Sequence, residues 1–187
     1  MNRRLILASA SPRRTDLMNK AGLTFEVIPA DVDELEDPDL GIEQLVSRNA
    51  ALKARHVSAS HLDAVVIGAD TLVALDGAPL GKPNNLDHAF EMLSRLVGKT
   101  HVVCTGVCLC LGEIGVEVQF IEQTHVTFRP LDEGEIRSYL ALINPLDKAG
   151  SYAAQDHGER IIASTDGSWT NVVGLPMERL LAELERL

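Results

Sequence analysis

The sequence predicts an α/β protein in which one mixed, twisted sheet is covered by flanking helices. In the first half of the chain, short apolar runs alternate with segments of helical periodicity, which is typical of parallel strands joined by crossover helices. In the second half, two long β-patterned segments, residues 101–111 and 116–128, flank a glycine-bounded turn and indicate a hairpin. No internal repeat or linker interrupts the 187 residues. We therefore expect a single domain over residues 1–187.

The composition argues against several classes of function. The chain has 27 acidic and 17 basic residues and a formal net charge of −10, which repels nucleic acid polymers and anionic membranes. No apolar run approaches the ~20 residues that a membrane-spanning helix needs. Residues 1–10 have too short an apolar stretch for a secretory signal. We predict a cytoplasmic protein that binds neither membranes nor nucleic acid polymers, although a local Arg and Lys cluster can still bind a small anion.

The first strand is expected at residues 5–8, and a helix should follow it without a linker. Ser11 suits the N-cap of this helix, and Pro12 suits its first position because proline has no amide hydrogen to leave unpaired. Gly22 should end the helix shortly after residue 20.

Arg13 and Arg14 then lie in the first helical turn, which is the unfavourable end for cations. The helix dipole is positive there and destabilises each charge by ~0.3–1 kcal/mol. A bound phosphate would remove that cost, because the amide N–H groups and both guanidinium groups would converge on it. The alternative is a pair of solvated arginines that interact with Asp16 or another acid.

A second strand is expected at residues 25–28, and an acidic loop follows it. Asp31, Asp33 and Glu34 are its first acids. One of these three carboxylates could hold a divalent metal if the loop folds over a cleft, since hard cations prefer oxygen ligands. Solvated surface acids are the alternative.

The helices are predicted from apolar residues that recur at helical spacing. They are expected at residues 42–56, 85–96 and 132–142, and after Pro176. Lys53 falls on the largely apolar side of the first of these helices. Its aliphatic stem could follow that surface while its ammonium group reaches solvent.

The central stretch, VVIGADTLVALDGAPLGKP, has the most chemical content. Residues 65–67 form an apolar run bounded by glycine, which favours a strand buried on both faces. Asp70 and Thr71 follow where that strand should end, which is where α/β sheets bind ligands. The Asp-Gly pair at residues 76–77 predicts a hairpin that returns Lys82 toward the same edge. An acid with a nearby amine suits phosphate chemistry, whereas a capping Asp and a solvated Lys are the alternative.

The C-terminal third contains a polar loop and a second hairpin signal. Residues 146–152 are polar and glycine-containing, and Gln155 follows them. The loop could line a pocket in which an amide side chain offers a donor and an acceptor to a nucleotide base, or it could be a plain connector. An Asp-Gly pair between residues 161–164 and 170–173 predicts the hairpin.

Three cysteines, Cys104, Cys108 and Cys110, occur in one β-patterned segment. Their even spacing places them on one side of a regular strand, with the outer pair ~20 Å apart. That separation suits neither a tetrahedral zinc site nor a close set of disulfides. We interpret them as buried thiols in a reducing compartment.

Four ordered blocks of residues resemble those of the Maf-like nucleoside triphosphate pyrophosphatases. They are LILASASPRR near the start, VIGADTLV with LGKP in the middle, LDKAGSYAAQ later, and NVVGLP before the last helix. The resemblance covers essentially the whole chain. It implies a fold similar to inosine triphosphate pyrophosphatase, a central nucleotide cleft and a homodimer. It also implies hydrolysis of nucleoside triphosphates to the monophosphate and pyrophosphate with Mg²⁺ or Mn²⁺, a house-cleaning role in the nucleotide pool.

The resemblance also assigns roles to individual residues. Asp70 would be the proton acceptor, and the pattern is that of the branch acting on dTTP and UTP. A departure at residues 154–157, AQDH in place of Ile-Gln-Gly, bears on base preference. The alternatives are a nucleotide-binding regulator of septum formation without turnover and a phosphomonoesterase. The implied site comprises Arg13, Thr71 and Gln155 for substrate selection, Ser9, Arg14, Lys53 and Lys82 for nucleotide binding, and Glu34 with Asp70 for the metal.

Overall fold

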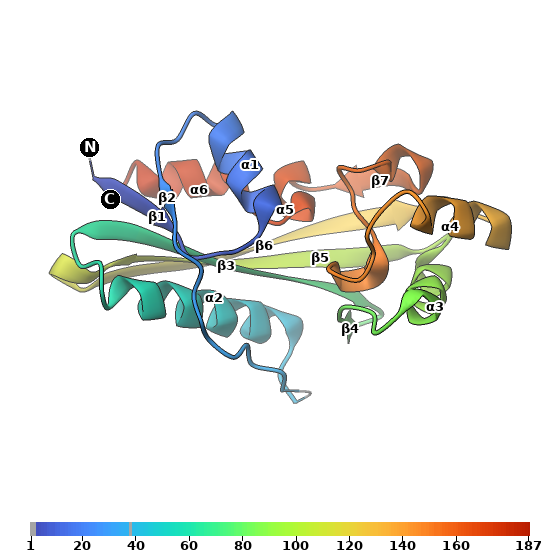
Figure 1. The fold of residues 1–187 in the computed structure, drawn as a ribbon, viewed down its shortest axis with the longest axis horizontal. Helices are drawn as coiled ribbons and strands as arrows, with labels where there is room; N and C mark the ends of the chain where they lie inside the picture. The colour runs from blue at the N-terminus through green and yellow to red at the C-terminus, as the bar shows by residue number, and fades with distance from the viewer. Residues whose placement is uncertain (1–2, 38) are drawn as a thin grey trace. The chain divides into compact units, whose positions relative to one another are not determined.

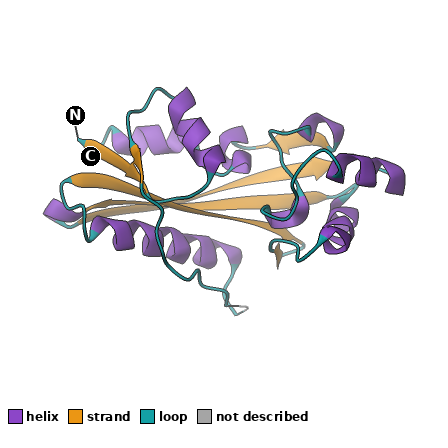
Figure 2. Cartoon of the chain, in the orientation of Figure 1, coloured by secondary structure: helices purple, strands orange, loops and turns teal. Residues whose placement is uncertain are grey.

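The computed structural model describes residues 3–37 and 39–187, and the strands of this part of the chain form one mixed sheet (Figures 1 and 2). The order is β2-β1-β3-β5-β6-β7, and β4 pairs with β3. β1 (Arg4–Leu7) is parallel to β2 (Glu26–Val27) and to β3 (Ala64–Leu75). β4 (Ala78–Leu80) and β7 (Ile162–Asp166) each pair antiparallel. The predicted α/β class with a mixed sheet is confirmed.

The chain divides into two compact units, and three long strands contribute to both. Unit 1 comprises residues up to 71, 105–122 and 174–187, and unit 2 comprises residues 72–104 and 123–173. The shared strands are β3, β5 (Thr100–Leu111) and β6 (Val116–Phe128).

In unit 1, helices cover both faces of the sheet (Figure 1). The apolar side chains of α1 (Pro12–Lys20) and α6 (Met177–Leu184) share one core cluster with β1 and β3. Those of α2 (Ile42–Ser58) share another cluster with the opposite face. These helices agree with the periodicity of the sequence.

Two glycines let α2 lie directly on the sheet. A Cβ atom at Gly68 in β3 would be 2.2 Å from the carbonyl oxygen of Ala50, and one at Gly106 in β5 would be 2.5 Å from the backbone of Val46. Real Cβ contacts are never that close, so no larger residue fits at either position. The contact brings the buried side of α2 against the middle of β3, where Asp70 lies.

In unit 2, α3 (Leu86–Leu96) and α4 (Glu133–Leu140) pack into a core cluster of their own. Asn85 caps α3 by accepting a hydrogen bond from the amide of His88. Asp132 caps α4 in a reciprocal capping box with Glu135. The β3–β4 turn has φ values of 52° at Asp76 and 80° at Gly77, so the predicted Asp-Gly hairpin is confirmed.

Two predictions of local structure are wrong. β3 does not end near Gly68 but continues to Leu75, so Asp70 and Thr71 lie within the strand. The second predicted hairpin is absent, because residues after β7 form the short helix α5 (Trp169–Val173). There Ser168 accepts a hydrogen bond from the amide of Asn171 through Oγ, and the Asn171 side-chain amide donates to the Val103 carbonyl. These tertiary bonds outweigh the β-propensity of the valines.

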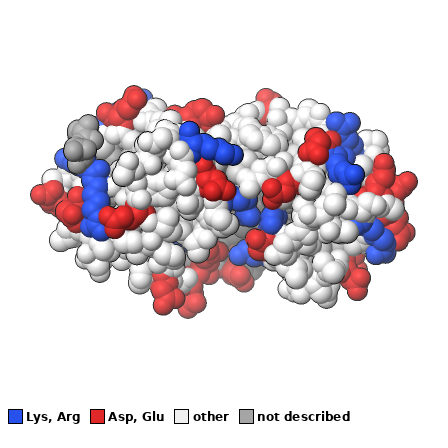
Figure 3. Space-filling model, turned by 45° about the horizontal axis from the view of Figure 1, so that its top comes forward, with Lys and Arg blue, Asp and Glu red and all other residues white. Residues whose placement is uncertain are grey.

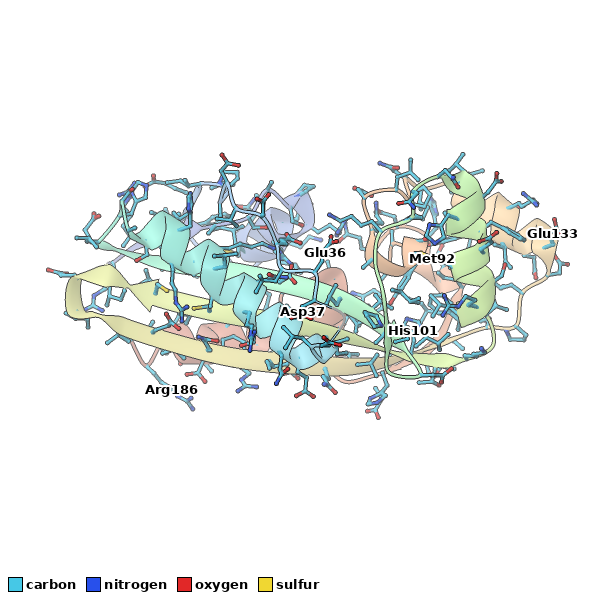
Figure 4. All side chains as sticks on the ribbon, turned by 90° about the horizontal axis from the view of Figure 1, so that it is seen from below. Glu36, Asp37, Met92, His101, Glu133 and Arg186 are labelled. Carbon is cyan, nitrogen blue, oxygen red and sulfur yellow. The ribbon has the colours of Figure 1, made fainter. Side chains whose placement is uncertain are left out.

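His101 on β5 is a buried histidine in the core of unit 2 (Figure 4). Its ring packs edge-on against Phe128 and Tyr152, and Nε2 lies 2.9 Å from the Tyr152 hydroxyl. Burial lowers the pKa of His101 to about 4. In the folded protein the ring therefore stays neutral at pH values at which an unfolded histidine already carries a proton.

We expect His101 to make the protein less stable in mild acid. Between pH 6.5 and 4 the unfolded chain binds more protons than the folded chain. The free energy of unfolding therefore decreases as the pH is lowered through that window. The loss from this group is about 3 kcal/mol. Urea unfolding at several pH values measures it, and His101→Gln serves as the non-titrating control. An unchanged pH slope in His101→Gln would contradict the assignment, because carboxylates would then account for all of the slope.

No helix in the described part of the chain is long and apolar enough to cross a membrane. The predicted cytoplasmic location stays a prediction.

Candidate functional site

Asp70 is a buried carboxylate in the middle of β3, and two side chains of α2 hold it. Its side chain is 8% exposed. Oδ1 accepts a hydrogen bond from Lys53 Nζ at 2.9 Å, and Oδ2 accepts one from Asn49 Nδ2 at 3.3 Å. Lys53 and Asn49 are one helical turn apart and face the strand together. The Asp70 carboxylate therefore has a fixed orientation.

Lys53 connects Asp70 to the acidic loop. Its Nζ lies 2.6 Å from Glu34 Oε1, and it also donates to the Ala69 carbonyl at 3.4 Å. The lysine is 8% exposed, so the interpretation of an aliphatic stem that carries its charge to solvent is wrong. All three acids, Asp31, Asp33 and Glu34, are exposed, and of these Glu34 is the one that forms an ion pair with Lys53. The ammonium charge offsets two carboxylates at once.

Asn49 belongs to the site, although the sequence analysis gave it no functional role. It is 3% exposed. Besides holding Asp70, it accepts from the amide of Leu35 at 2.8 Å and donates to the Leu35 carbonyl at 3.3 Å. It thereby fixes the acidic loop next to Asp70. The available signal was its spacing: Asn49 and Lys53 are polar residues four apart on a buried helical side.

Arg14 is buried at the start of α1, and most of its donors are used within unit 1. Nε donates to the Gly174 carbonyl at 2.8 Å, and Nη2 donates to Thr71 Oγ1 at 3.0 Å. Nη1 donates to Ser9 Oγ at 3.0 Å and to the Ala69 carbonyl at 2.9 Å. Of the five guanidinium N–H groups, one is left for a ligand. The alternative of a solvated Arg14 paired with an acid is therefore wrong.

Electrostatically, Arg14 is an unusual buried cation. Burial lowers the pKa of Arg14 from its ordinary value, and the nearby Asp70 charge opposes that effect. Its direct partners are carbonyl and hydroxyl oxygens, not a carboxylate. The positive charge is thus available to an anion at this end of α1.

Arg13 differs from its neighbour. It is partly exposed, and in residues 3–37 and 39–187 it has no hydrogen bond or ion pair that would hold it. Ser11 occupies the N-cap position as predicted, but its side chain makes no capping bond. The beginning of α1 therefore presents a cation with free donors.

Thr71 forms hydrogen bonds with three other segments of unit 1. Its hydroxyl accepts from Arg14, shares a hydrogen bond of 2.9 Å with Thr105 Oγ1, and lies 3.4 Å from the Gly174 carbonyl. Gly174 has a φ of 125°, which only glycine adopts readily. Thr71 thus orients Arg14, and neither Thr105 nor Gly174 was singled out from the sequence.

Unit 2 contains the two remaining candidates, Lys82 and Gln155. Both are exposed. The amide of Gly150 donates to the Gly81 carbonyl at 3.1 Å, so the polar loop of residues 146–152 lies beside the segment that carries Lys82. Lys148 in this loop is buried and donates to the Asn144 carbonyl and to Asp147.

The unusual residues after Ala154 adopt one strained conformation. His157 has a φ of 61°, in the left-handed region that favours glycine, whereas Asp156 is not in that region. Asp156 therefore causes no backbone strain by itself. Any effect of Asp156 on a ligand would come from its charge.

The carboxylates near Lys53 suit a divalent cation. Glu34 Oε1 and Asp70 Oδ1 converge on a single cationic group, within 2.6 and 2.9 Å of Lys53 Nζ. Mg²⁺ is commonly bound by one or two carboxylates together with substrate phosphates. Two acids from different segments thus provide oxygen donors for such a cation.

Charge on the surface is mixed despite the net charge of −10. On the face drawn in Figure 3, acidic and basic side chains are interspersed, and neither sign forms one continuous field. This distribution is compatible with a small anionic ligand held by local cations.

Comparisons with known proteins agree with the motif pattern. A family model described as "Maf-like protein" matches residues 4–187. A dTTP/UTP pyrophosphatase of Akkermansia muciniphila is 46% identical over 183 residues, which cover 98% of this chain and 96% of that protein. A dTTP/UTP pyrophosphatase of Caldicellulosiruptor bescii is 42% identical over 189 residues, with 99% and 95% covered. Among solved structures, a HAM1 protein from Coxiella burnetii is 18% identical with a TM-score of 0.49, covering 67% of this chain and 72% of its own.

Proposed function

The chain belongs to the Maf-like protein family, and from this premise we propose that it hydrolyses dTTP and UTP to the monophosphate and pyrophosphate. The curated relatives with that name are up to 46% identical over nearly the whole chain. The observation that carries the reaction type is the buried Asp70 carboxylate, fixed by Lys53 and Asn49 beside Glu34. Such a group can orient a water molecule toward phosphorus.

In the proposed reaction, water attacks the α-phosphorus of the triphosphate. A new P–O bond forms, the bond from the α-phosphorus to the bridging oxygen breaks, and pyrophosphate leaves with the electron pair. Asp70 orients the water and accepts its proton, which then passes to solvent. Asn49 and Lys53 hold the two carboxylate oxygens in place, so the lone pair that faces the water is defined.

A divalent cation, Mg²⁺ or Mn²⁺, is part of the proposal. Glu34 and Asp70 would hold it, because their oxygens already converge on one positive charge. When bound, it supplies charge compensation for the phosphate oxygens and the leaving group. Lys53 holds these carboxylates close together before the cation binds.

Substrate binding is assigned to the remaining candidates. Arg13 has free donors for a phosphate or a base, and Arg14 contributes its charge and one N–H group. Thr71 acts by orienting Arg14. From the motif resemblance, Lys82 would bind phosphate and Gln155 would exchange hydrogen bonds with the carbonyl–imide edge of a pyrimidine. A homodimer is proposed on the same resemblance and is tested by light scattering at several protein concentrations.

A nucleotide panel tests the proposal. We expect pyrophosphate release from UTP and dTTP in the presence of Mg²⁺ or Mn²⁺, with kcat/KM at least about 100-fold above that for GTP and ATP, as a pocket with matched hydrogen bonds can provide. Pyrophosphate and orthophosphate are measured separately. Release of orthophosphate alone would indicate a phosphomonoesterase. Nucleotide binding without release of either product would support the regulatory alternative and contradict the proposal.

A further inference from the structure

A second group of chemically reactive side chains lies in unit 1, away from Asp70. Cys108 and Cys110 on β5 and Glu117 on β6 each present one ligand atom, and these three atoms lie within 4.8 Å of one another. The two thiols are buried, and the carboxylate is at the surface. None of the three residues takes part in the proposed hydrolysis.

The sulfur positions correct the interpretation of the cysteines from the sequence. That interpretation used the outer pair, Cys104 and Cys110, which are too far apart along the strand to share a ligand. The inner pair differs: Cys108 Sγ and Cys110 Sγ are 3.7 Å apart. Residues two apart on a strand point to the same side, so their sulfurs can meet.

The separations match those of a tetrahedral zinc site. Two sulfurs at ~2.3 Å from a tetrahedral Zn²⁺ are ~3.8 Å apart, and a sulfur and a carboxylate oxygen at ~2.0–2.2 Å are ~3.5–3.7 Å apart. The observed distances are 3.7 Å between the sulfurs and 3.8 Å from Cys110 Sγ to Glu117 Oε2. The thiols therefore need little movement to bind zinc, whereas a disulfide would require them to approach to ~2.05 Å.

The carboxylate is oriented by neighbours of the kind that support metal ligands. Arg55 on α2 donates to both oxygens of Glu117, at 2.7 Å each, and Gln119 donates to Oε1. A carboxylate has about four lone-pair sites, so Glu117 can keep these bonds and still offer one lone pair to a metal. Hydrogen-bonded carboxylates of this kind are typical around metal sites.

The group opens into a pocket, so an ion can reach it. A cavity of about 270 Å³ is lined by Cys110 and Glu117 together with Arg55, Ser58 and Leu62, among others. Water can occupy a fourth coordination position from this side. Two thiolates, one carboxylate and a water form a donor set that suits zinc, because zinc accepts sulfur and oxygen ligands in tetrahedral geometry.

We propose that Cys108, Cys110 and Glu117 form a Zn²⁺ site that links the β5–β6 hairpin to α2 through Arg55. Each thiol loses its proton to solvent when the ion binds. The site is separate from the hydrolytic cation, since Glu34 and Asp70 provide oxygen ligands and no sulfur. It does not depend on the proposed hydrolysis.

Metal titration of the full chain tests the site. The protein is treated with a chelator and kept under a reductant that does not bind zinc, and Co²⁺ and Zn²⁺ are then titrated in turn. We expect one Co²⁺ per chain with a thiolate-to-cobalt charge-transfer band in the ultraviolet, which Zn²⁺ abolishes on displacing Co²⁺. A cation at Asp70 gives no such band. We also expect the midpoint of thermal unfolding to rise with zinc concentration.

Three variants complete the experiment. Cys110→Ser and Glu117→Gln should weaken zinc binding at least about 100-fold and about 10-fold, respectively. Cys104→Ser, on the same strand but outside the group, should bind zinc as the unchanged protein does. Glu117 is at the surface, so its variant keeps the test valid if Cys110→Ser does not fold. Absence of the charge-transfer band in the unchanged protein, or equal loss in Cys104→Ser, would overturn the proposal, whether or not UTP is hydrolysed.

Discussion

Asp70→Asn is expected to lower kcat for UTP by about 10³-fold, within the range that a general base contributes, while the nucleotide still binds. The amide is nearly the same size as the carboxylate, but it is not basic. The amide oxygen can still accept a hydrogen bond from Lys53. The ammonium group of Lys53 therefore keeps both of its side-chain partners, residue 70 and Glu34. The loss should therefore appear in kcat and not in affinity.

The structure also predicts a small structural effect of this substitution. Asn49 is fixed by Leu35, to which it both donates and accepts, so it cannot rotate its amide to suit a new donor. The new NH₂ group would face Asn49 Nδ2, and one hydrogen bond would be lost. That costs about 1 kcal/mol of unfolding free energy. The protein remains folded, and the kinetic result stays interpretable.

Asp76→Asn is the matched control. It makes the same chemical change in the turn that follows β3, at a φ of 52° that Asn tolerates well. Turnover should be unchanged in this control. Pyrophosphate release gives kcat, and calorimetric titration with a non-hydrolysable UTP analogue gives affinity. An Asp70→Asn enzyme that keeps more than a tenth of kcat would exclude Asp70 as the proton acceptor.

Local pattern predicted most of the architecture, and its limits are physical. Periodicity placed α2, α3 and the β5–β6 hairpin within a few residues. The prediction is wrong at β3, because an apolar run followed by a glycine and an acid indicates the end of a strand, whereas β3 continues to Leu75. A carboxylate is tolerated inside a doubly covered strand only because Lys53 and Asn49 reach it from α2. Both contacts are tertiary, since Asn49 and Lys53 lie 21 and 17 residues before Asp70 in the chain. The residues next to Asp70 in the sequence do not predict them.

The site residues and their roles stay predictions, but the structure shows how their surroundings differ. The position of two cations at a helix start, unfavourable in itself, drew attention to both Arg13 and Arg14. That position does not distinguish the two arginines, because Arg14 is held by distant parts of the chain, among them the carbonyl of Gly174, 160 residues later. The sequence pattern treated both as anion ligands, whereas the contacts make Arg14 largely a structural residue and leave Arg13 open.

This difference gives the second large prediction: Arg14→Lys should lower the free energy of unfolding by about 3–5 kcal/mol. A lysine keeps the charge but cannot reach the carbonyls of Ala69 and Gly174 and the hydroxyls of Ser9 and Thr71 in one geometry. Each buried acceptor left without a donor costs about 1–3 kcal/mol. Urea unfolding measures the change.

Arg13→Lys is the matched control, because it makes the same substitution one residue earlier at a partly exposed position. Its unfolding free energy should change by less than about 0.5 kcal/mol, while KM for UTP rises because the planar, forked donor is gone. Equal stability losses in the two variants would show that the contacts of Arg14 do not carry the difference. A large loss in Arg14→Lys alone would mean that Arg14, through Thr71 and the Ala69 carbonyl, holds the chain on either side of Asp70. The position of the carboxylate that we propose as the proton acceptor would then depend on a cation that it does not contact.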